Sequence, residues 1–161
     1  MMPSLLHAVM LVSAIGPAAQ SLAQASAQTS VPPATVAAPS ILGTLPRQAL
    51  PQRGCAAFLW TVEDQRLVAM AEHGRLRIML DDKPVDLPVT RAEGAGAFGF
   101  AGVTSYAGSG AAVTLSMTVV QRDTLKDGAI VGDASLRVAR NGGDEIAVPV
   151  GGLIGCAPQN P

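Results

Sequence analysis

The two cysteines of this 161-residue chain enclose nearly all of the side chains from which a core and a polar surface can be built. Residues 55–156 hold every Phe, Trp and Tyr of the chain and all but two of its charged residues. Cys55 and Cys156 are far apart, whereas a redox or metal site favours a Cys-x-x-Cys pair or nearby histidines. We therefore expect a structural disulfide between them, provided that the chain leaves the reducing cytosol.

The beginning of the chain has the pattern of a secretory signal peptide. No charged residue occurs before Arg47, and residues 5–19 form an apolar run that is too short to span a membrane. Small residues follow, and Ala23-Gln24-Ala25 or Ala25-Ser26-Ala27 matches a small-residue cleavage motif. The usual Lys or Arg before the run is missing. We expect residues 1–27 to be a signal peptide and the mature protein to be periplasmic or extracellular.

Residues 28–53 have the composition of a linker. Its prolines stand among small and uncharged residues, at Pro32, Pro33, Pro39, Pro46 and Pro51. Proline fixes φ and removes a backbone donor, so we expect a disordered, semi-extended tether. The folded domain is then expected over residues 54–157, with a C-terminal tail over 158–161. We expect no transmembrane segment in the mature protein.

Apolar and polar residues alternate in the expected domain with the period of two that is typical of β-strands. The clearest alternation runs over residues 113–119, and the apolar run over 55–62 is typical of a strand covered on both faces. Turn signals separate the strands at Glu72-His73-Gly74, Asp81-Asp82-Lys83-Pro84 and Asn141-Gly142-Gly143-Asp144. About eight strands are expected. The nine segments with a strand pattern are 55–62, 67–71, 76–80, 85–89, 97–101, 103–107, 113–119, 134–138 and 146–156.

The expected disulfide also restricts the topology. A bond between Cys55 and Cys156 holds two Cα atoms within about 7 Å, so the first and last strands become neighbours. An even-numbered antiparallel meander with that property is a closed barrel, which removes exposed strand edges. We predict a small antiparallel barrel of about eight strands. A two-sheet β-sandwich is the alternative, because the number of strands does not separate the two.

Charge and motif spacing argue against several classes of ligand. The net charge of -1 lacks the basic excess that nucleic-acid binding needs, so no nucleic acid is expected. Residues 94–99 match G-x-G-x-x-G, with glycines at Gly94, Gly96 and Gly99. A dinucleotide site places that motif before a helix, whereas a strand pattern follows here, so we interpret the match as an irregular connection. We expect no cofactor.

The titratable residues give little support for catalysis or metal binding. His73 lies in an expected turn, and no G-x-S-x-G motif is present to expose a serine nucleophile. Asp81 and Asp82 are adjacent, so their side chains diverge on an extended chain, although two catalytic carboxylates must converge. Asp86 could join them in a weak cation site, but the spacing is not that of an EF-hand loop. No catalytic residue and no metal site are expected.

Aromatic residues beside glycines are the best candidates for a contact surface. Phe98, Phe100 and Tyr106 lie in or next to a glycine-rich segment, and Ser109 follows it. Aromatic side chains usually belong to the core when a domain has so few of them. A glycine-rich loop at the mouth of a barrel would instead present these residues to a ligand.

Ser109-Gly110 resembles the Ser-Gly motif of the periplasmic inhibitors of c-type lysozyme. Those inhibitors are small barrels of similar length, in which a Tyr or Lys follows the motif shortly afterwards. Here Ala111, Ala112 and Val113 follow it, so no functional residue is carried over. The resemblance implies lysozyme inhibition as one candidate function.

Export and the lack of an evident catalytic group favour a non-enzymatic binding or interaction module of the periplasm or cell envelope. Its expected partner is a protein or another envelope ligand of unknown identity. The alternatives are a structural envelope protein held by its tether, a protein similar to the lysozyme inhibitors, and a hydrolase built on His73, Asp81 or Asp82.

Overall fold

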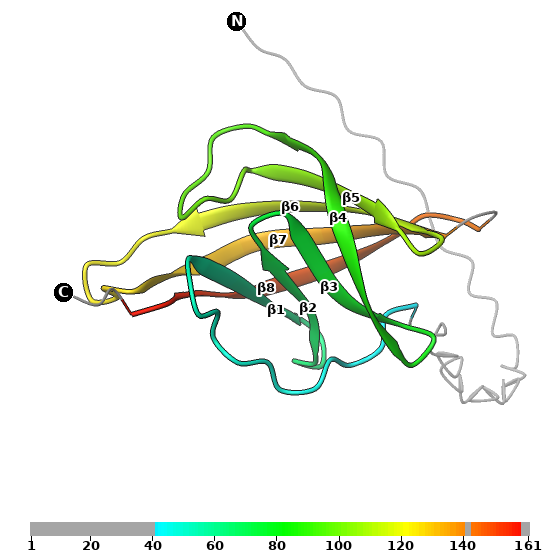
Figure 1. Cartoon of the computed structure of the whole chain (residues 1–161), viewed down its shortest axis with the longest axis horizontal. Helices are drawn as coiled ribbons and strands as arrows, with labels where there is room; N and C mark the ends of the chain where they lie inside the picture. Colours follow the sequence, from blue (N-terminus) through cyan, green and yellow to red (C-terminus); the bar gives the residue numbers. More distant parts are fainter. Residues whose placement is uncertain (1–40, 141–142, 159–161) are drawn as a thin grey trace, which may run out of the picture. The chain divides into compact units, whose positions relative to one another are not determined.

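The computed structural model describes residues 41–140 and 143–158, and they form a closed antiparallel β-barrel (Figure 1). Eight strands follow one another around the ring in sequence order, and no helix occurs among the described residues. The strands are β1 (Cys55–Thr61), β2 (Leu67–Glu72), β3 (Arg75–Leu80), β4 (Lys83–Glu93), β5 (Val103–Gly108), β6 (Ala111–Val120), β7 (Gly128–Arg140) and β8 (Ile146–Cys156). The predicted all-β barrel is confirmed, and the sandwich alternative is wrong.

The ring closes between the first strand and the last. β1 and β8 pair antiparallel over the whole length of β1, and the Cys55–Cys156 disulfide joins two residues that lie directly opposite each other. Their Cα atoms are 3.9 Å apart. The predicted disulfide between the first and last strands is therefore present. The end of the barrel that carries this bond is termed the disulfide end, and the opposite end is termed the distal end.

Alternation along the strands fills the interior of the barrel. In β6, for example, Ala111, Val113, Leu115 and Met117 are buried, and the residues between them face outward. Six of the other strands contribute inward aliphatic side chains in the same way, and β5 contributes Tyr106, so one main core runs through the ring. The largest side chains with almost no exposure are Leu59, Leu76, Ile78, Leu87, Leu115, Leu136, Val68, Val113, Val131, Val138 and Val150.

The chain before β1 runs along the outside of β1, β2 and β3, where it is cyan in Figure 1. Residues 41–53 are termed the strap. The backbone N–H of Gly43 donates a hydrogen bond to the carbonyl of Met79 at 3.0 Å, and that of Leu45 donates to Leu67 at 2.7 Å. Backbone hydrogen bonds therefore attach the strap to the neighbouring strands β2 and β3.

The strap covers a second, smaller apolar cluster on the outside of the barrel. The buried members of this cluster are Leu45, Ala56, Phe58 and Met70. β1 is apolar on both faces because the main core lies on one side and this outer cluster on the other. The sequence predicted that residues 55–62 form a strand covered on both faces, and the strap is what covers the outer one.

The strap is the last part of the segment that the sequence predicted as a disordered linker. Leu42 belongs to the main core and Leu45 to the outer cluster, and they are 2% and 3% exposed. Residues 41–53 therefore pack on the barrel, and the ordered unit begins before the expected boundary at Gly54. The predicted signal peptide, residues 28–40 of the predicted linker and residues 159–161 of the predicted tail lie outside the described residues.

One expected strand is a loop. Residues 97–101 belong to the connection between β4 and β5, where Phe98 and Gly99 have φ values of 57° and 83°. This left-handed backbone interrupts an extended strand. A Cβ on Gly96 would lie 1.8 Å from the carbonyl oxygen of Phe100, so the loop folds back on itself at a position that only glycine allows. Part of the expected turn at residues 141–144 lies outside the described residues.

Loss of the disulfide is expected to lower the free energy of unfolding by about 4–5 kcal/mol, because the bond closes a long loop in the unfolded chain. The two cysteines are separated by 101 positions. Urea unfolding followed by circular dichroism should give a lower midpoint for the Cys55→Ser/Cys156→Ser variant than for the oxidised protein. Equal midpoints for the oxidised and reduced wild-type protein would contradict the prediction.

Candidate functional site

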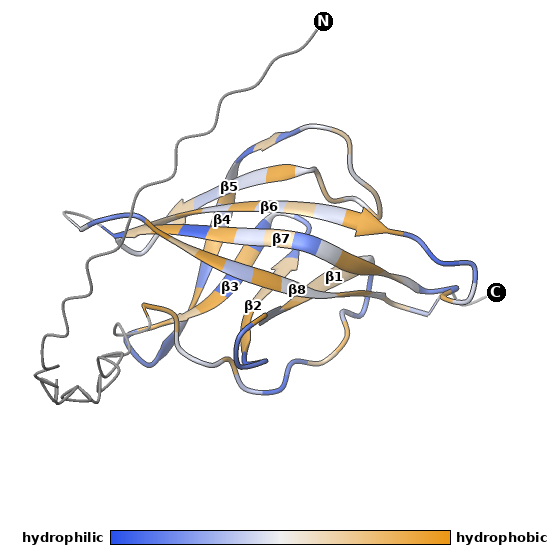
Figure 2. Ribbon diagram, turned by 180° about the vertical axis from the view of Figure 1, so that it is seen from behind, coloured by the Kyte–Doolittle hydropathy of each residue, from blue (hydrophilic) through white to orange (hydrophobic). Residues whose placement is uncertain are grey.

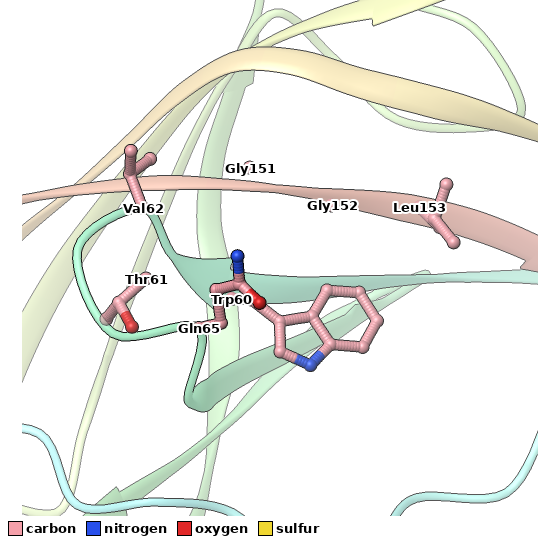
Figure 3. Close-up of a pocket in the computed structure, with 7 residues that line it drawn as sticks. All are labelled: Trp60, Thr61, Val62, Gln65, Gly151, Gly152 and Leu153. Carbon is pink, nitrogen blue, oxygen red and sulfur yellow. The ribbon is translucent and has the colours of Figure 1, made fainter.

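An open, apolar hollow lies on the outer surface of the barrel, across the pairing of β1 with β8 (Figure 3). It has a volume of about 460 Å³ and is termed the β8 hollow. Its lining residues are Trp60, Thr61, Val62, Gln65, Gly151, Gly152 and Leu153. Trp60 lies directly opposite Gly151 in the ladder, so the indole stands beside bare backbone. Figure 3 shows Trp60 and Gln65 on one side of the hollow and the ribbon of β8 on the other.

The hollow forms because β8 has no large outward side chain at its middle. Val150 and Ile154 are buried in the core, and Gly151 lies between the outward positions Pro149 and Leu153. Leu153 is 50% exposed, and Val62 at the opposite edge of the hollow is 66% exposed. Large apolar side chains therefore surround a floor of backbone. Contiguous exposed apolar surface is a feature of interaction sites.

The two glycines of the floor have different physical roles. A Cβ on Gly152 would lie 1.9 Å from the carbonyl oxygen of Phe58, so close packing of β8 on β1 requires glycine there. A Cβ on Gly151 would approach no atom outside its chain neighbours closer than 3.6 Å, and its φ is not in the left-handed region. The barrel would accept a side chain at Gly151. The lack of a side chain at Gly151 leaves the surface open, and the packing of the strands does not require it.

The hollow adjoins a row of apolar side chains that crosses four strands. Phe58, Leu153, Ile130 and Val120 occupy opposed positions on β1, β8, β7 and β6, and of these Phe58 is buried in the outer cluster. Figure 2 shows the end of β6 and parts of β8 in the colour of hydrophobic residues. Val120 is also exposed, and none of these four side chains carries a charge. The uncharged surface is therefore continuous beyond the hollow itself.

A second hollow adjoins the first at Thr61 and Val62. It has a volume of about 380 Å³, and its lining adds Glu63, Asp64, Arg66, Ala147, Val148 and Pro149. The hydroxyl of Thr61 donates to Asp64 and accepts a hydrogen bond from the N–H of Arg66 at 3.0 Å. This hydroxyl and the Arg66 guanidinium hold the pKa of the Asp64 carboxyl below its ordinary value. The network fixes the β1–β2 turn, and with it Val62, between the two hollows.

The outer face of β3 and β4 is charged, in contrast to that of β8. Arg77 donates two hydrogen bonds to the Asp86 carboxylate at 2.7 and 2.8 Å, and Arg75 lies 3.4 Å from the same group. The guanidinium of Arg77 in particular lowers the pKa of Asp86. A polar surface of this kind is what water-facing strands usually have. The outward row of β8, by contrast, has no polar side chain.

The residues that the sequence predicted as a contact surface do not form one surface. Phe100 and Tyr106 are 9% and 2% exposed and belong to the main core, and burial raises the pKa of the Tyr106 hydroxyl. Phe98 is half-buried and packs against that core from the β4–β5 loop at the disulfide end. Ser109 lies in the β5–β6 turn at the distal end. Core packing uses the aromatic side chains, and the length of the barrel separates Ser109 from Phe98.

The Ser-Gly pair that resembles the lysozyme-inhibitor motif forms a hairpin turn. Ser109 and Gly110 have φ values of 50° and 74°, and Gly108 pairs with Ala111 around them. A two-residue connection with both φ values positive is a common β-hairpin turn. The local backbone therefore accounts for the glycine of the pair.

The structure does not bring the candidate catalytic residues together. His73 precedes β3 and Asp81 and Asp82 follow it, so they lie at opposite ends of the barrel. Asp81 pairs with Arg140, which lowers the pKa of the carboxyl. Gly94, Gly96 and Gly99 all lie within the β4–β5 loop, which leads into strand β5. In the described part of the chain, no group of three or more His, Cys, Asp or Glu side chains is placed to hold a metal ion.

Sequence reasoning missed the β8 hollow, although one signal for it is present. The outward positions of β8 are Ala147, Pro149, Gly151 and Leu153, a row without a polar side chain. In a strand with water on one face, inward apolar residues normally alternate with outward polar residues. The sequence predicted a strand over residues 146–156, but the outward row was not identified as a contact surface. The contribution of Trp60 was not accessible, because it depends on the register of β1 against β8.

Comparisons of this chain with protein-family models, with curated proteins and with solved structures find no match. Among the described residues, no helix has the length and apolar character that crossing a membrane requires.

The two floor glycines are expected to respond differently to the same substitution. Gly152→Ala should lower the free energy of unfolding by about 2–3 kcal/mol, because the added methyl group overlaps the backbone of β1. Gly151→Ala should change it by less than about 0.5 kcal/mol, as for an ordinary surface position. Urea midpoints of both variants test the difference. Similar midpoints for the two variants would show that the floor is not packed as described.

The ion pair of Asp86 with Arg77 is expected to stabilise the barrel at neutral pH but not in acid. Because its pKa is lowered in the folded protein, the stabilisation is present above the ordinary carboxyl pKa and is lost as the pH falls through the lowered value. Asp86→Asn should cost up to about 1 kcal/mol at pH 7, since both side chains are partly exposed. The cost should decrease as the pH falls from the ordinary carboxyl pKa through the lowered value. Asp123→Asn, at an exposed position, is the control.

Proposed function

We propose that this chain is an exported, non-enzymatic binding module of the periplasm or cell envelope, which presents the β8 hollow to a partner polypeptide. The observation that carries this proposal is the exposed apolar floor between Trp60 and Leu153, on a rigid barrel whose interior is filled by its own side chains. A filled interior leaves the outer surface as the place for contact. The interaction is one of surface burial and involves no bond-making chemistry.

The shape of the hollow favours a protein partner over a small molecule. Small-molecule sites are concave and bury most of the ligand surface. The β8 hollow is open, and Val62 and Leu153 project at its edges. Protein interfaces combine a buried apolar centre with aromatic anchors such as tryptophan, and Trp60 takes that place here. Gln65 supplies an amide at the rim that can hydrogen-bond to a partner backbone.

Two observations support placement outside the cytosol. The sequence begins with the pattern of a signal peptide, and the barrel is closed by a disulfide, which persists in oxidising compartments. The chain has no cysteine other than this bonded pair. We expect the mature protein to begin after Ala25 or Ala27.

Capture from an envelope extract tests the proposal. Tagged, oxidised protein should retain at least one polypeptide, counting untagged copies of itself, that Leu153→Asp fails to retain. The charge introduced by that substitution would have to be buried in an apolar interface. Val103→Asp is the matched control, because Val103 is an exposed valine on β5 at 38% exposure. Identical sets of proteins retained by the wild type and Leu153→Asp would contradict the proposal.

A further inference from the structure

We propose that the partner covering the β8 hollow is a second copy of this chain, bound through the same face in a two-fold symmetric dimer. This inference rests on the proposed function, since it takes the hollow as a protein-binding face. The argument comes from the pattern of large and absent side chains on β7 and β8, and from the charges at the two ends of β1.

Each of the two neighbouring strands carries an outward apolar residue close to an outward glycine. On β8 these are Leu153 and Gly151, and on β7 they are Ile130 and Gly132. Leu153 and Ile130 lie opposite each other in the β7–β8 ladder. The glycines are neighbours as well, since a Cβ on Gly151 would lie 3.6 Å from the carbonyl oxygen of Gly132. The face therefore carries a raised apolar pair beside a bare pair.

No clash inside the barrel requires either glycine of the bare pair, although Gly132 lies in the bulge of β7 that faces Gly151. A Cβ on Gly132 would meet only a methyl group of Val120, at the ordinary contact distance of 3.5 Å. Gly151 has the same freedom, and neither glycine has a left-handed φ. Glycine within a strand often marks a bulge or a site where another backbone approaches closely, and the bare pair lies at a bulge that also leaves room for such an approach. Both glycines face outward, so a backbone that approaches them closely belongs to another molecule or to another segment of chain.

A two-fold axis makes this pattern self-complementary. The axis lies in the plane of the interface, runs at right angles to β8 and crosses β8 at Gly152. It places Leu153 of one copy over Gly151 of the other, and Ile130 over Gly132. Each contact occurs twice, as an isologous interface requires. An axis parallel to β8 would instead set Leu153 against Leu153 and leave the bare pair uncovered.

The charges at the two ends of β1 favour the same axis. Arg53 lies just before β1 at the disulfide end, and Glu63 lies just after it at the distal end. Both are exposed, and neither forms an ion pair with another described residue. The proposed axis turns the disulfide end of one copy toward the distal end of the other, so Arg53 and Glu63 approach as opposite charges. The parallel axis would bring like charges together, which costs affinity.

Sedimentation equilibrium of the purified, oxidised protein is the first test. A concentration-dependent dimer is expected, and Gly151→Glu should raise its dissociation constant by at least about tenfold, or 1.4 kcal/mol. The barrel accepts a side chain at Gly151, so circular dichroism should show an intact fold. Val103→Glu is the matched control and should leave the dimer unchanged. A wild-type monomer throughout, or a dimer that Gly151→Glu does not weaken, would overturn the proposal.

Cysteine cross-linking tests the axis itself. A mixture of Leu153→Cys and Gly151→Cys chains should form intermolecular disulfides between unlike variants, under oxidation that leaves Cys55–Cys156 intact. Each variant alone should cross-link several-fold less. If Leu153→Cys alone cross-linked as much as the mixture, the result would indicate the parallel axis and overturn the arrangement.

The two proposals fail separately. A purified protein that stays monomeric, together with an envelope polypeptide that Leu153→Asp releases, would overturn the dimer and leave the proposed function in place. If the purified protein is a monomer and Leu153→Asp does not change the set of captured proteins, both proposals are overturned.

Discussion

The pairing of β1 with β8 is the constraint on which the rest of the molecule depends. These strands are the first and last of the ring, so their ladder converts an open meander into a closed barrel without free edges. The disulfide fixes one end of the ladder, and Gly152 lets the two backbones approach along its length. The same pairing places Trp60 beside Gly151, so the seam that closes the barrel also creates its candidate binding surface.

The strap covers one part of an apolar outer surface, and the β8 hollow lies on a part of the same surface that is open. β1 has apolar residues on its outer face, and the strap covers those nearest to β2 with Leu45. On the other side of β1 the surface continues over β8 and β7, where the described part of the chain places no comparable cover over Leu153. Burial of apolar side chains stabilises a surface in proportion to the area removed from water. A partner that binds the uncovered part would therefore bury the most apolar area, and binding there would be the most favourable.

Much of the fold was accessible from the sequence because it depends on local patterns. Period-two alternation located most of the strands, and the separation of Cys55 from Cys156 indicated how the ring closes. The strap was not accessible, because Leu42 and Leu45 stand in a segment whose proline content is typical of a linker. Proline excludes a segment from a sheet interior but does not prevent it from packing along the outside of one.

The candidate site was less accessible than the fold, for a geometric reason. Trp60 and Gly151 are about ninety positions apart, and only the register of the closing ladder makes them neighbours. Local reasoning selected aromatic residues that stand near glycines along the chain, such as Phe100 and Tyr106. The structure uses those side chains to fill the core. The relevant aromatic and glycine residues lie near each other in space and not in sequence.

Closure between the two terminal strands also has a kinetic consequence. The ladder that completes the ring joins residues that are the most distant in the domain, and such long-range pairing must overcome a large loop entropy before any contact forms. Folding is therefore expected to be slow for a chain of this size, with β1 and β8 as open edges until the last step. A chain that has not yet formed this ladder exposes two apolar strands at open edges, so it is expected to aggregate more readily than the finished barrel.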